Sequence, residues 1–181
     1  TMTDGYDDNS GLGKDVPFTI NYIDLNGYSG DLVNETSSGT GVTFDKTDPT
    51  LSSLTIATNN ANDASLCKTD DIVTVTFVAN ELLQPSVMEI AGKSADEVEG
   101  PTATTWIGAY TMQGGDTEGD VALEVAFMDY AGNSGETSTE TSDASAVSFD
   151  RTLPTLDVVT IVSDNDNNQA ATTGNTLTLS I

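Results

Sequence analysis

The chain repeats itself at a spacing of 105 residues, and this internal similarity limits its fold more than any other feature of the sequence. Residues 44–51 (FDKTDPTL) recur as residues 149–156 (FDRTLPTL), and residues 24–30 (DLNGYSG) recur as residues 129–135 (DYAGNSG). Residues 56–62 (IATNNAN) match residues 161–167 (IVSDNDN). A period of about one hundred residues is that of a small domain. We therefore expect a tandem array of domains.

The period divides the chain into three parts. Residues 1–47 are expected to be the C-terminal part of one repeat, residues 48–152 a complete repeat, and residues 153–181 the N-terminal part of a third. Phe77 matches Ile181 when one residue is skipped after the Asn-rich loop. The two partial repeats together lack the equivalent of residues 78–110. We therefore expect the natural protein to continue in both directions, or neighbouring chains to complete the partial repeats.

Alternation of apolar and polar residues predicts the strands of the complete repeat. The predicted strands are residues 51–58, 72–79, 87–91, 94–98, 104–112, 121–128 and 139–149. Within the sixth, Val121, Leu123, Val125 and Phe127 are expected to face the core, which also receives Trp106. Seven short strands in about a hundred residues are typical of an immunoglobulin-like sandwich. The predicted fold class is therefore all-β, with immunoglobulin-like Greek-key β-sandwich repeats in tandem.

The order of these motifs also suggests a family. Residues 44–51, residues 56–63 (IATNNAND), Tyr110-Thr111-Met112 followed by GDTEG, and residues 129–133 (DYAGN) together resemble the tandem bacterial-type Ig-like repeats of large extracellular surface proteins and adhesins. The resemblance implies a stalk, a spacer or an adhesive module. Tyr28 departs from the pattern, because the matching residue in the complete repeat is Asn133.

Charge narrows the possible partners. The sequence has 29 acidic residues against five basic ones and no His, a formal net charge of −24. Such a surface repels phosphates, which argues against nucleic acid binding, and it repels itself unless cations screen it. Divalent cations with oxygen ligands are one remedy. Solubility, or adaptation to a salty medium, is another explanation of the same acidity. No run approaches the ~20 apolar residues of a membrane span.

Acidic and amide side chains are predicted to meet at one end of the complete repeat. In a sandwich of alternating strands, the linker before the first strand and the loops after the second and sixth strands gather at the same end. These segments supply Asp45, Glu81, Asp129 and Asn133. Calcium binds six to eight oxygens from carboxylates, amides, carbonyls and water. The four residues are therefore a candidate calcium site at the junction with the preceding repeat.

A second, weaker candidate lies at the opposite end, where the loops supply Asp63, Asp116, Glu118 and Asp150. Simpler explanations exist for both sets. Asp45 and Asp150 can cap turns before a proline, and Asp129 with Gly132 is an ordinary tight-turn pattern. The loop at residues 59–63 and its counterpart at residues 164–168 have the pattern of Asx turns and lack the closing Glu of an EF-hand.

Catalytic patterns are missing from the sequence. Without His there is no Ser-His-Asp arrangement and no His-ligated zinc, and the Gly-rich stretch 113–119 lacks the Lys of a phosphate-binding loop. Cys67 is the only cysteine, so it is expected either to be buried as a small hydrophobe or to pair outside this segment. Asn34-Glu35-Thr36 is a sequon for N-glycosylation.

These observations predict a non-catalytic structural segment of a long extracellular protein. It would serve as a calcium-stiffened stalk or as a building block of a filament at the cell surface, with neighbouring repeats as its partners. Two alternatives remain open: a module that binds glycans or other cell-surface proteins, and an accessory domain of a secreted hydrolase. A glycan-binding module would expose two or three aromatic rings on one face, whereas Tyr6, Tyr28 and Tyr130 are scattered among the repeats.

Overall fold

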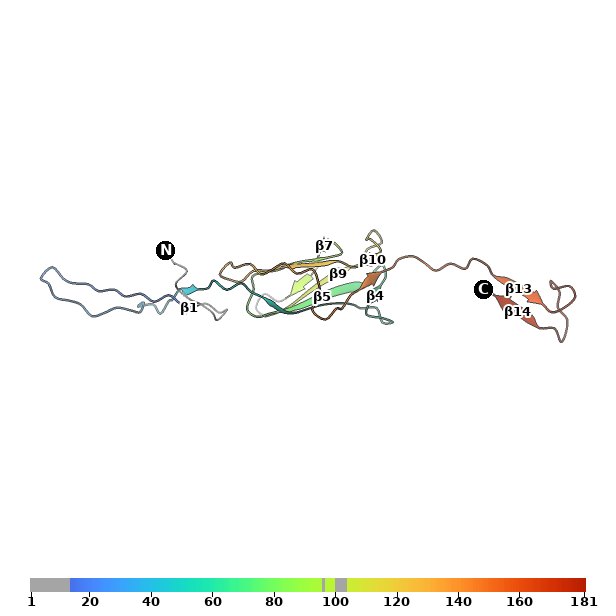
Figure 1. The fold of residues 1–181 in the computed structure, drawn as a ribbon, viewed down its shortest axis with the longest axis horizontal. Coiled ribbons are helices and arrows are strands. Elements are labelled where there is room, and N and C mark those ends of the chain that lie inside the picture. Colours follow the sequence, from blue (N-terminus) through green and yellow to red (C-terminus); the bar gives the residue numbers. More distant parts are fainter. Residues whose placement is uncertain (1–13, 96, 100–103) are drawn as a thin grey trace. The chain divides into compact units, whose positions relative to one another are not determined.

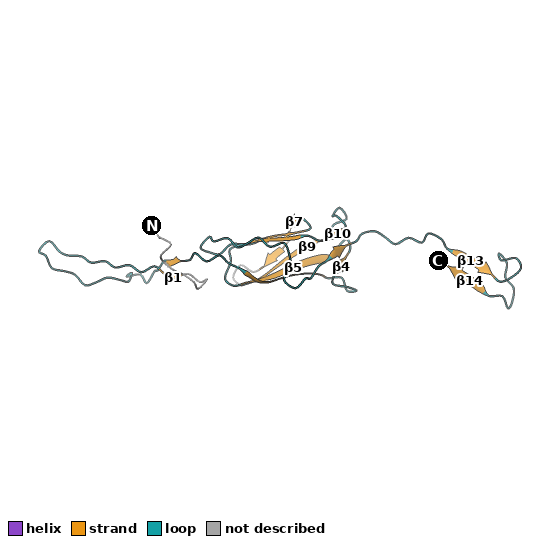
Figure 2. Ribbon diagram, viewed as in Figure 1, coloured by secondary structure: helices purple, strands orange, loops and turns teal. Residues whose placement is uncertain are grey.

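The computed structural model describes residues 14–95, 97–99 and 104–181, and it divides the chain into two compact units, residues 1–150 and 151–181. The described residues form strands and loops and no helix, so the fold is all-β (Figures 1 and 2). In this described part, no helix is long and apolar enough to cross a membrane.

The first sheet of the complete repeat has four antiparallel strands in the order β3-β5-β9-β8. These strands are Leu51–Thr58 (β3), Ile72–Ala79 (β5), Thr105–Thr111 (β9) and Glu97–Glu99 (β8). β5 lies in the middle because its β-branched residues suit a strand paired on both sides. Its alternating residues Val73, Val75, Phe77 and Ala79 are all buried, as the period-two pattern requires.

Two smaller sheets form the rest of the complete repeat. One has the order β11-β6-β7, with strands Leu123–Ala126, Val87–Ile90 and Lys93–Ser94. The other has the order β10-β12-β4, with strands Gly119–Asp120, Ser148–Phe149 and Leu66–Cys67. β12 pairs with β4 in parallel and with β10 in antiparallel orientation. Isolated bridges join Val125 to Ser138 and Met128 to Ser134 and so bring the following segment alongside β11.

One apolar core lies between these sheets. Trp106 of β9 is 1% exposed, and its ring stacks on Phe77 of β5 at 6.1 Å between centroids. Phe77 also meets Phe127, which follows β11, at 6.2 Å. Strands from different sheets therefore share a single hydrophobic cluster, which gives the complete repeat a sandwich-like character. The expected core position of Trp106 is confirmed.

The predicted strands agree with the structure where the alternation is strong and differ where it is weak. β3 and β5 have the predicted bounds, and β6 and β9 are slightly shorter than predicted. β11 covers only the middle half of the predicted strand at residues 121–128. The prediction of a strand over residues 139–149 was wrong for most of its length, because only β12 is a regular strand there. Serine side chains hold that segment instead: Ser142 Oγ accepts from Leu54 N at 3.0 Å, and Ser145 Oγ accepts from Ile56 N at 3.0 Å.

The N-terminal hairpin (residues 14–44) reproduces the hydrogen bonds of residues 119–149 at a spacing of 105 residues. β1 (Lys14–Asp15) pairs with β2 (Thr43–Phe44) in the same register in which β10 pairs with β12. The bridges Ile20–Val33 and Ile23–Ser29 correspond to Val125–Ser138 and Met128–Ser134. The sequence repeat is therefore matched by a repeat of the backbone ladder.

The unit of residues 151–181 contains a second copy of the β3–β5 pair. In this C-terminal hairpin (residues 160–180), β13 (Thr160–Ser163) pairs with β14 (Leu177–Ser180), and Ile161 lies opposite Leu179 as Ile56 lies opposite Val75. The spacing is 105 residues in the first strand and 104 in the second, which agrees with the one-residue gap in the sequence match.

Candidate metal centre

The structure brings three of the four predicted ligand residues together. Asp45 follows β2, Glu81 follows β5 and Asp129 follows β11. One carboxylate oxygen of each lies within 4.8 Å of the others. Glu81 and Asp129 are buried, and Asp45 is half-buried. Segments far apart in the sequence thus meet at the end of the sandwich where the topology was expected to place them.

A tight turn fixes the Asp129 carboxylate. Its Oδ1 accepts hydrogen bonds from Gly132 N at 2.7 Å and Asn133 N at 2.9 Å, and its Oδ2 accepts from Asn133 Nδ2 at 2.7 Å. These bonds agree with the simpler explanation, in which Asp129 forms a tight turn. A carboxylate has about four lone-pair directions, so these three bonds leave room for a further partner.

Asn133 holds the site through its amide nitrogen. Besides Asp129, its Nδ2 donates to the backbone oxygen of Asp45 at 3.3 Å. Asn133 therefore links the loop after β11 to the linker after β2. In this orientation Asn133 positions the carboxylate of Asp129 and is not itself one of the three clustered acidic residues, although the sequence predicted it as a ligand.

The linker and the loop after β5 are held in a similar way. Asp45 Oδ1 accepts from Thr47 N at 3.0 Å, which is the expected turn cap before Pro49. Next to Glu81, Asn80 accepts from Thr50 N at 2.7 Å and donates to Glu81 Oε1 at 3.4 Å. The bond to Asp45 stays within the linker, whereas Asn80 connects Glu81 to Thr50, the residue before β3.

Gln84 supports the site and was not predicted. Its Nε2 donates to the backbone oxygen of Asp129 at 2.7 Å, and its backbone nitrogen donates to Met128 O at 2.9 Å. Residues 78–110 have no second copy in this chain, so Gln84 belongs to no repeated motif that could have singled it out.

The arrangement suits a divalent cation with oxygen ligands. Two oxygens bound to one Ca²⁺ at 2.3–2.6 Å lie at most about 5 Å apart, and the three carboxylate oxygens meet this limit. At that distance, two like charges near a protein surface repel by roughly 3 kcal/mol. A cation between the carboxylates would relieve this repulsion. Calcium would require further oxygens from water or backbone carbonyls.

The second predicted set does not assemble into a comparable group among the described residues. Asp63 accepts from the backbone and hydroxyl of Ser65, and the hydroxyl bond is the main reason why the pKa of Asp63 is below its ordinary value. Asp116 is buried and accepts from Gln113 N at 2.7 Å and from the hydroxyl of Tyr110 at 3.3 Å. Glu118 and Asp150 are exposed. This end of the repeat is built from turn-forming bonds.

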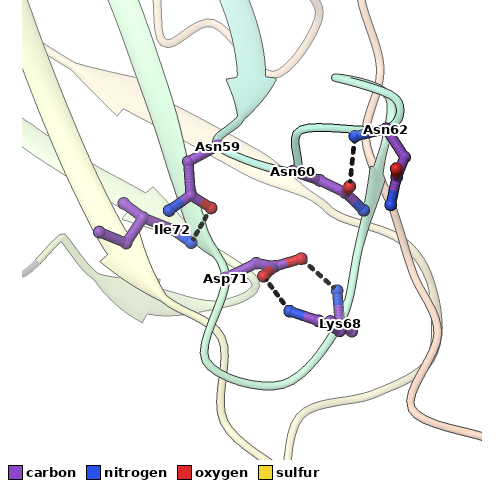
Figure 3. Close-up of polar contacts among 6 residues, drawn as sticks. All are labelled: Asn59, Asn60, Asn62, Lys68, Asp71 and Ile72. Carbon is purple, nitrogen blue, oxygen red and sulfur yellow. Dashed lines mark hydrogen bonds and ion pairs between the residues drawn. The ribbon is translucent and has the colours of Figure 1, made fainter.

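The Asn-rich loop after β3 has the same character (Figure 3). Asn60 Oδ1 accepts from Asn62 N at 2.9 Å, which is an Asx turn. Asn59 Oδ1 accepts from Ile72 N at 2.8 Å and so connects the ends of β3 and β5. Asp71 accepts from both the backbone and the ammonium of Lys68, and these bonds lower the pKa of Asp71.

Other residues singled out in the sequence lie apart from the cluster. Asn34 is exposed on the N-terminal hairpin. Cys67 is a free, buried thiol of the core, which favours its role as a small hydrophobe, and burial together with the nearby Asp71 charge raises its pKa. Tyr28 and Tyr130 are exposed loop residues, and Tyr6 lies outside the described residues.

Comparisons of the chain with protein families, with curated proteins and with solved structures find no match.

Proposed function

We propose that the chain is a non-catalytic structural segment of a long extracellular protein, in which Ig-like repeats follow one another as a stalk or as filament units. The observation that carries the proposal is the recurrence of the backbone hydrogen bonds of the complete repeat in both partial repeats, at spacings of 105 and 104 residues. A chain that repeats a module with its register intact has the organisation of a repetitive scaffold.

Strand order supports the Ig-like part of the proposal. Constant-type immunoglobulin domains have one sheet of strands A, B, E and D and another of C, F and G. The order β3-β5-β9-β8 corresponds to A-B-E-D when β4, β7 and β10 are regarded as short additions. The pairing of β6 with β11, and the bridges from Val125 to Ser138 and from Met128 to Ser134, correspond to C-F-G.

The contact between the two ends of the module supports a load-bearing role. Ser142 and Ser145 bind the backbone of Leu54 and Ile56 in parallel order, and β12 pairs in parallel with β4. The segments nearest the two ends of the complete repeat therefore lie side by side in parallel. A pull on the ends loads these bonds in shear, all at once, which resists extension better than opening them one by one.

Force spectroscopy on the full chain tests this role. Pulling from both termini should show one cooperative event for the complete repeat, with a release of roughly 30–35 nm of chain for about one hundred residues. The two partial repeats should extend earlier and at low force. Gradual extension of the complete repeat, with no separate force peak, would contradict a stalk function.

Calcium is the proposed stiffening ion at the cluster of Asp45, Glu81 and Asp129. Sites in extracellular modules bind at about 10⁻⁴–10⁻³ M. A tenfold excess of calcium over its Kd would stabilise the folded module by about 1.4 kcal/mol. This corresponds to a rise in Tm of about 5–10 °C over the chelated protein. An identical Tm in calcium and in chelator would refute the metal site.

A pair of matched variants separates the cluster from its turn. Asp129→Asn keeps an oxygen for the turn amides but removes one carboxylate and the acceptor of Asn133 Nδ2, so it should abolish most of the calcium-dependent rise. Asp24 is the control, since its Oδ1 accepts from Asn26 N at 2.9 Å and from Tyr28 N at 2.8 Å in a similar turn outside the cluster. Asp24→Asn should leave the calcium response intact. Equal loss in both variants would mean that the turn matters and the cluster does not.

A further inference from the structure

The hydrogen-bond ladder between β11 and the segment that follows it is interrupted at Leu123. On one side of the gap, Val125 N donates to Ser138 O at 2.9 Å, and on the other, Val121 N donates to Val147 O at 2.8 Å. Val147 lies nine positions after Ser138, whereas Val125 lies only four positions after Val121. The excess chain therefore bends away from β11.

This bulge, residues 139–146, leaves the backbone of Leu123 without a partner on that side. Successive residues of an antiparallel strand direct their N–H and C=O groups to opposite neighbours. Ala122 O accepts from Ala91 N at 2.8 Å on the side of β6, so Leu123 directs its groups toward the bulge. None of the described residues of the bulge forms a hydrogen bond with Leu123, although Leu123 is only 8% exposed. A buried donor and a buried acceptor are therefore open to a ligand.

A groove occupies the space between β11 and the bulge. Its volume is about 330 Å³, and a second hollow of about 280 Å³ continues it toward β6. Ala122, Leu123 and Thr139 line both parts, and Ile56 and Val121 add apolar surface to the first part. An apolar floor next to unpaired backbone groups suits a short piece of extended peptide.

The same groove recurs 105 residues earlier in the chain. In the complete repeat, its first part is lined by residues 121–123, 139–141 and 144–146 together with Ile56. A groove of about 480 Å³ in the N-terminal hairpin is lined by residues 15–18, 34–36 and 39–41. Both walls of that groove belong to one hairpin, and Phe18 stands at the position of Leu123. The groove is therefore a feature of the repeat.

The bulge also keeps its backbone conformation in both copies. Ala144 has a φ of 60°, and Gly39 at the equivalent position has a φ of 68°. This left-handed region is unfavourable for a residue with a side chain. Thr141 Oγ1 donates to Ser145 O at 2.8 Å and so fixes the turn around Ala144. Strain of this kind persists only where the surrounding structure holds it, and it is concentrated at binding sites.

Three carboxylates surround the groove. Glu140 lines its first part, and Glu89 and Glu124 line its second. Glu89 of β6 and Glu124 of β11 lie directly opposite each other in the sheet. Like charges in directly opposite positions destabilise a sheet. A positively charged ligand would relieve this repulsion, so the groove is complementary in charge to a basic partner.

We propose that this groove binds an extended, basic peptide segment of a partner protein, which adds a short strand to the edge of β11. The backbone of the peptide bonds to the N–H and C=O of Leu123. The peptide residue opposite Leu123 points its side chain inward toward Ile56, because directly opposite residues share a face of the sheet. The two flanking residues point to the other face, where Glu89 and Glu124 lie. The ligand is thus an apolar residue between two basic ones.

This binding function goes beyond the stalk and does not depend on it, because each module binds through its own groove. One groove in every repeat makes a long array multivalent, so weak single contacts add up to firm attachment. No aromatic ring is among the described residues that line the groove of the complete repeat, so the groove does not suit the stacking of a sugar.

NMR titration of the full chain with the peptide acetyl-Lys-Val-Lys-amide tests the proposal. The amide signal of Leu123 should shift and saturate. In the free protein this amide should exchange with solvent faster than the hydrogen-bonded amides of Val121 and Val125, and the peptide should slow its exchange. The same peptide with an N-methylated Val lacks the N–H that bonds to Leu123 O, and it should not bind.

A pair of charge variants separates the groove from the general acidity of the chain. Glu124→Gln should weaken the binding of the peptide by about twofold to fivefold, as expected for one exposed ion pair. Glu136 is the matched control, because it is exposed on the segment after β11 and lines neither part of the groove. Glu136→Gln changes the net charge equally and should leave the affinity as it is.

Any of four results would overturn the proposal. They are a Leu123 signal that does not saturate, a Leu123 amide as protected in the free protein as that of Val125, equal binding of the N-methylated peptide, and equal weakening by Glu136→Gln. None of these results touches the force peak of the complete repeat. Failure of the peptide groove is therefore distinguishable from failure of the stalk function.

Discussion

Ile56 and Ile161 occupy the same position in two copies of one hairpin, with the same cross-strand pairing, yet only Ile56 is buried. The backbone ladder forms in both regions, because it depends on local pairing and on the turn between the strands. Burial differs because a sheet face is covered only by distant segments, and the described residues 151–181 contain only the first two strands of the module. A hairpin by itself therefore specifies the backbone pairing, whereas burial of its apolar face requires the rest of the sandwich.

Removing a core ring should give the largest contrast between the two regions. Phe77→Ala takes away the partner of Trp106 and Phe127 and should destabilise the complete repeat by about 3–5 kcal/mol. Ile181→Ala, at the equivalent position, removes a side chain that is 83% exposed and should change the stability by less than about 0.5 kcal/mol. Urea unfolding followed by Trp fluorescence measures both changes. A similar loss on Ile181→Ala would contradict the exposure of Ile181.

Part of the fold was predictable from the sequence, since strong alternation of apolar and polar residues placed β3 and β5 at their observed bounds. The grouping of Asp45, Glu81 and Asp129 followed from the strand order expected of a sandwich. The segment at residues 139–147 was not predictable, because serine hydroxyls replace part of its ladder and a hydroxyl leaves no periodic signal. The short strand β4 was missed for a similar reason: its two residues are too few to show a period.

Substitution of two equivalent glycines, Gly135 and Gly30, should give a difference in stability of intermediate size. A Cβ at Gly135 would collide with the ring of Phe127, and a Cβ at Gly30 would collide with the ring of Tyr22. Phe127 is held in the core, so Gly135→Ala should cost about 1–3 kcal/mol in urea unfolding of the complete repeat. The exposed ring of Tyr22 can move aside, so Gly30→Ala should leave the same transition in place. A large effect of Gly30→Ala would show that the N-terminal hairpin packs more tightly than its exposure indicates.

The smallest expected difference concerns how stability depends on pH at Asp71 and at its equivalent, Asn175. The bonds from Lys68 lower the pKa of Asp71 below its ordinary 3.8, so this carboxylate stabilises the fold above that pH. The contribution is lost as the pH falls through the lower pKa of the folded state. Asn175 stands at the equivalent position and accepts from Thr172 N at 2.7 Å without a charge. Asp71→Asn should therefore keep the turn and remove this pH dependence, at a cost below about 1 kcal/mol at pH 7.

Thermal melting between pH 2 and pH 7 measures that dependence. The two proteins should converge in stability at the acid end of the range. A mutant curve parallel to that of the unmodified chain would mean that other carboxylates control the acid response.

The loop between the first two strands of the module is one residue shorter in the C-terminal hairpin, yet the strands keep their partners. Its Asx turns absorb the change in length locally. The exposed part of this loop at residues 61–62, ahead of β4, is consequently a suitable place to graft a peptide tag or a reporter dye, because an insertion there would leave the pairing of β3 with β5 in place.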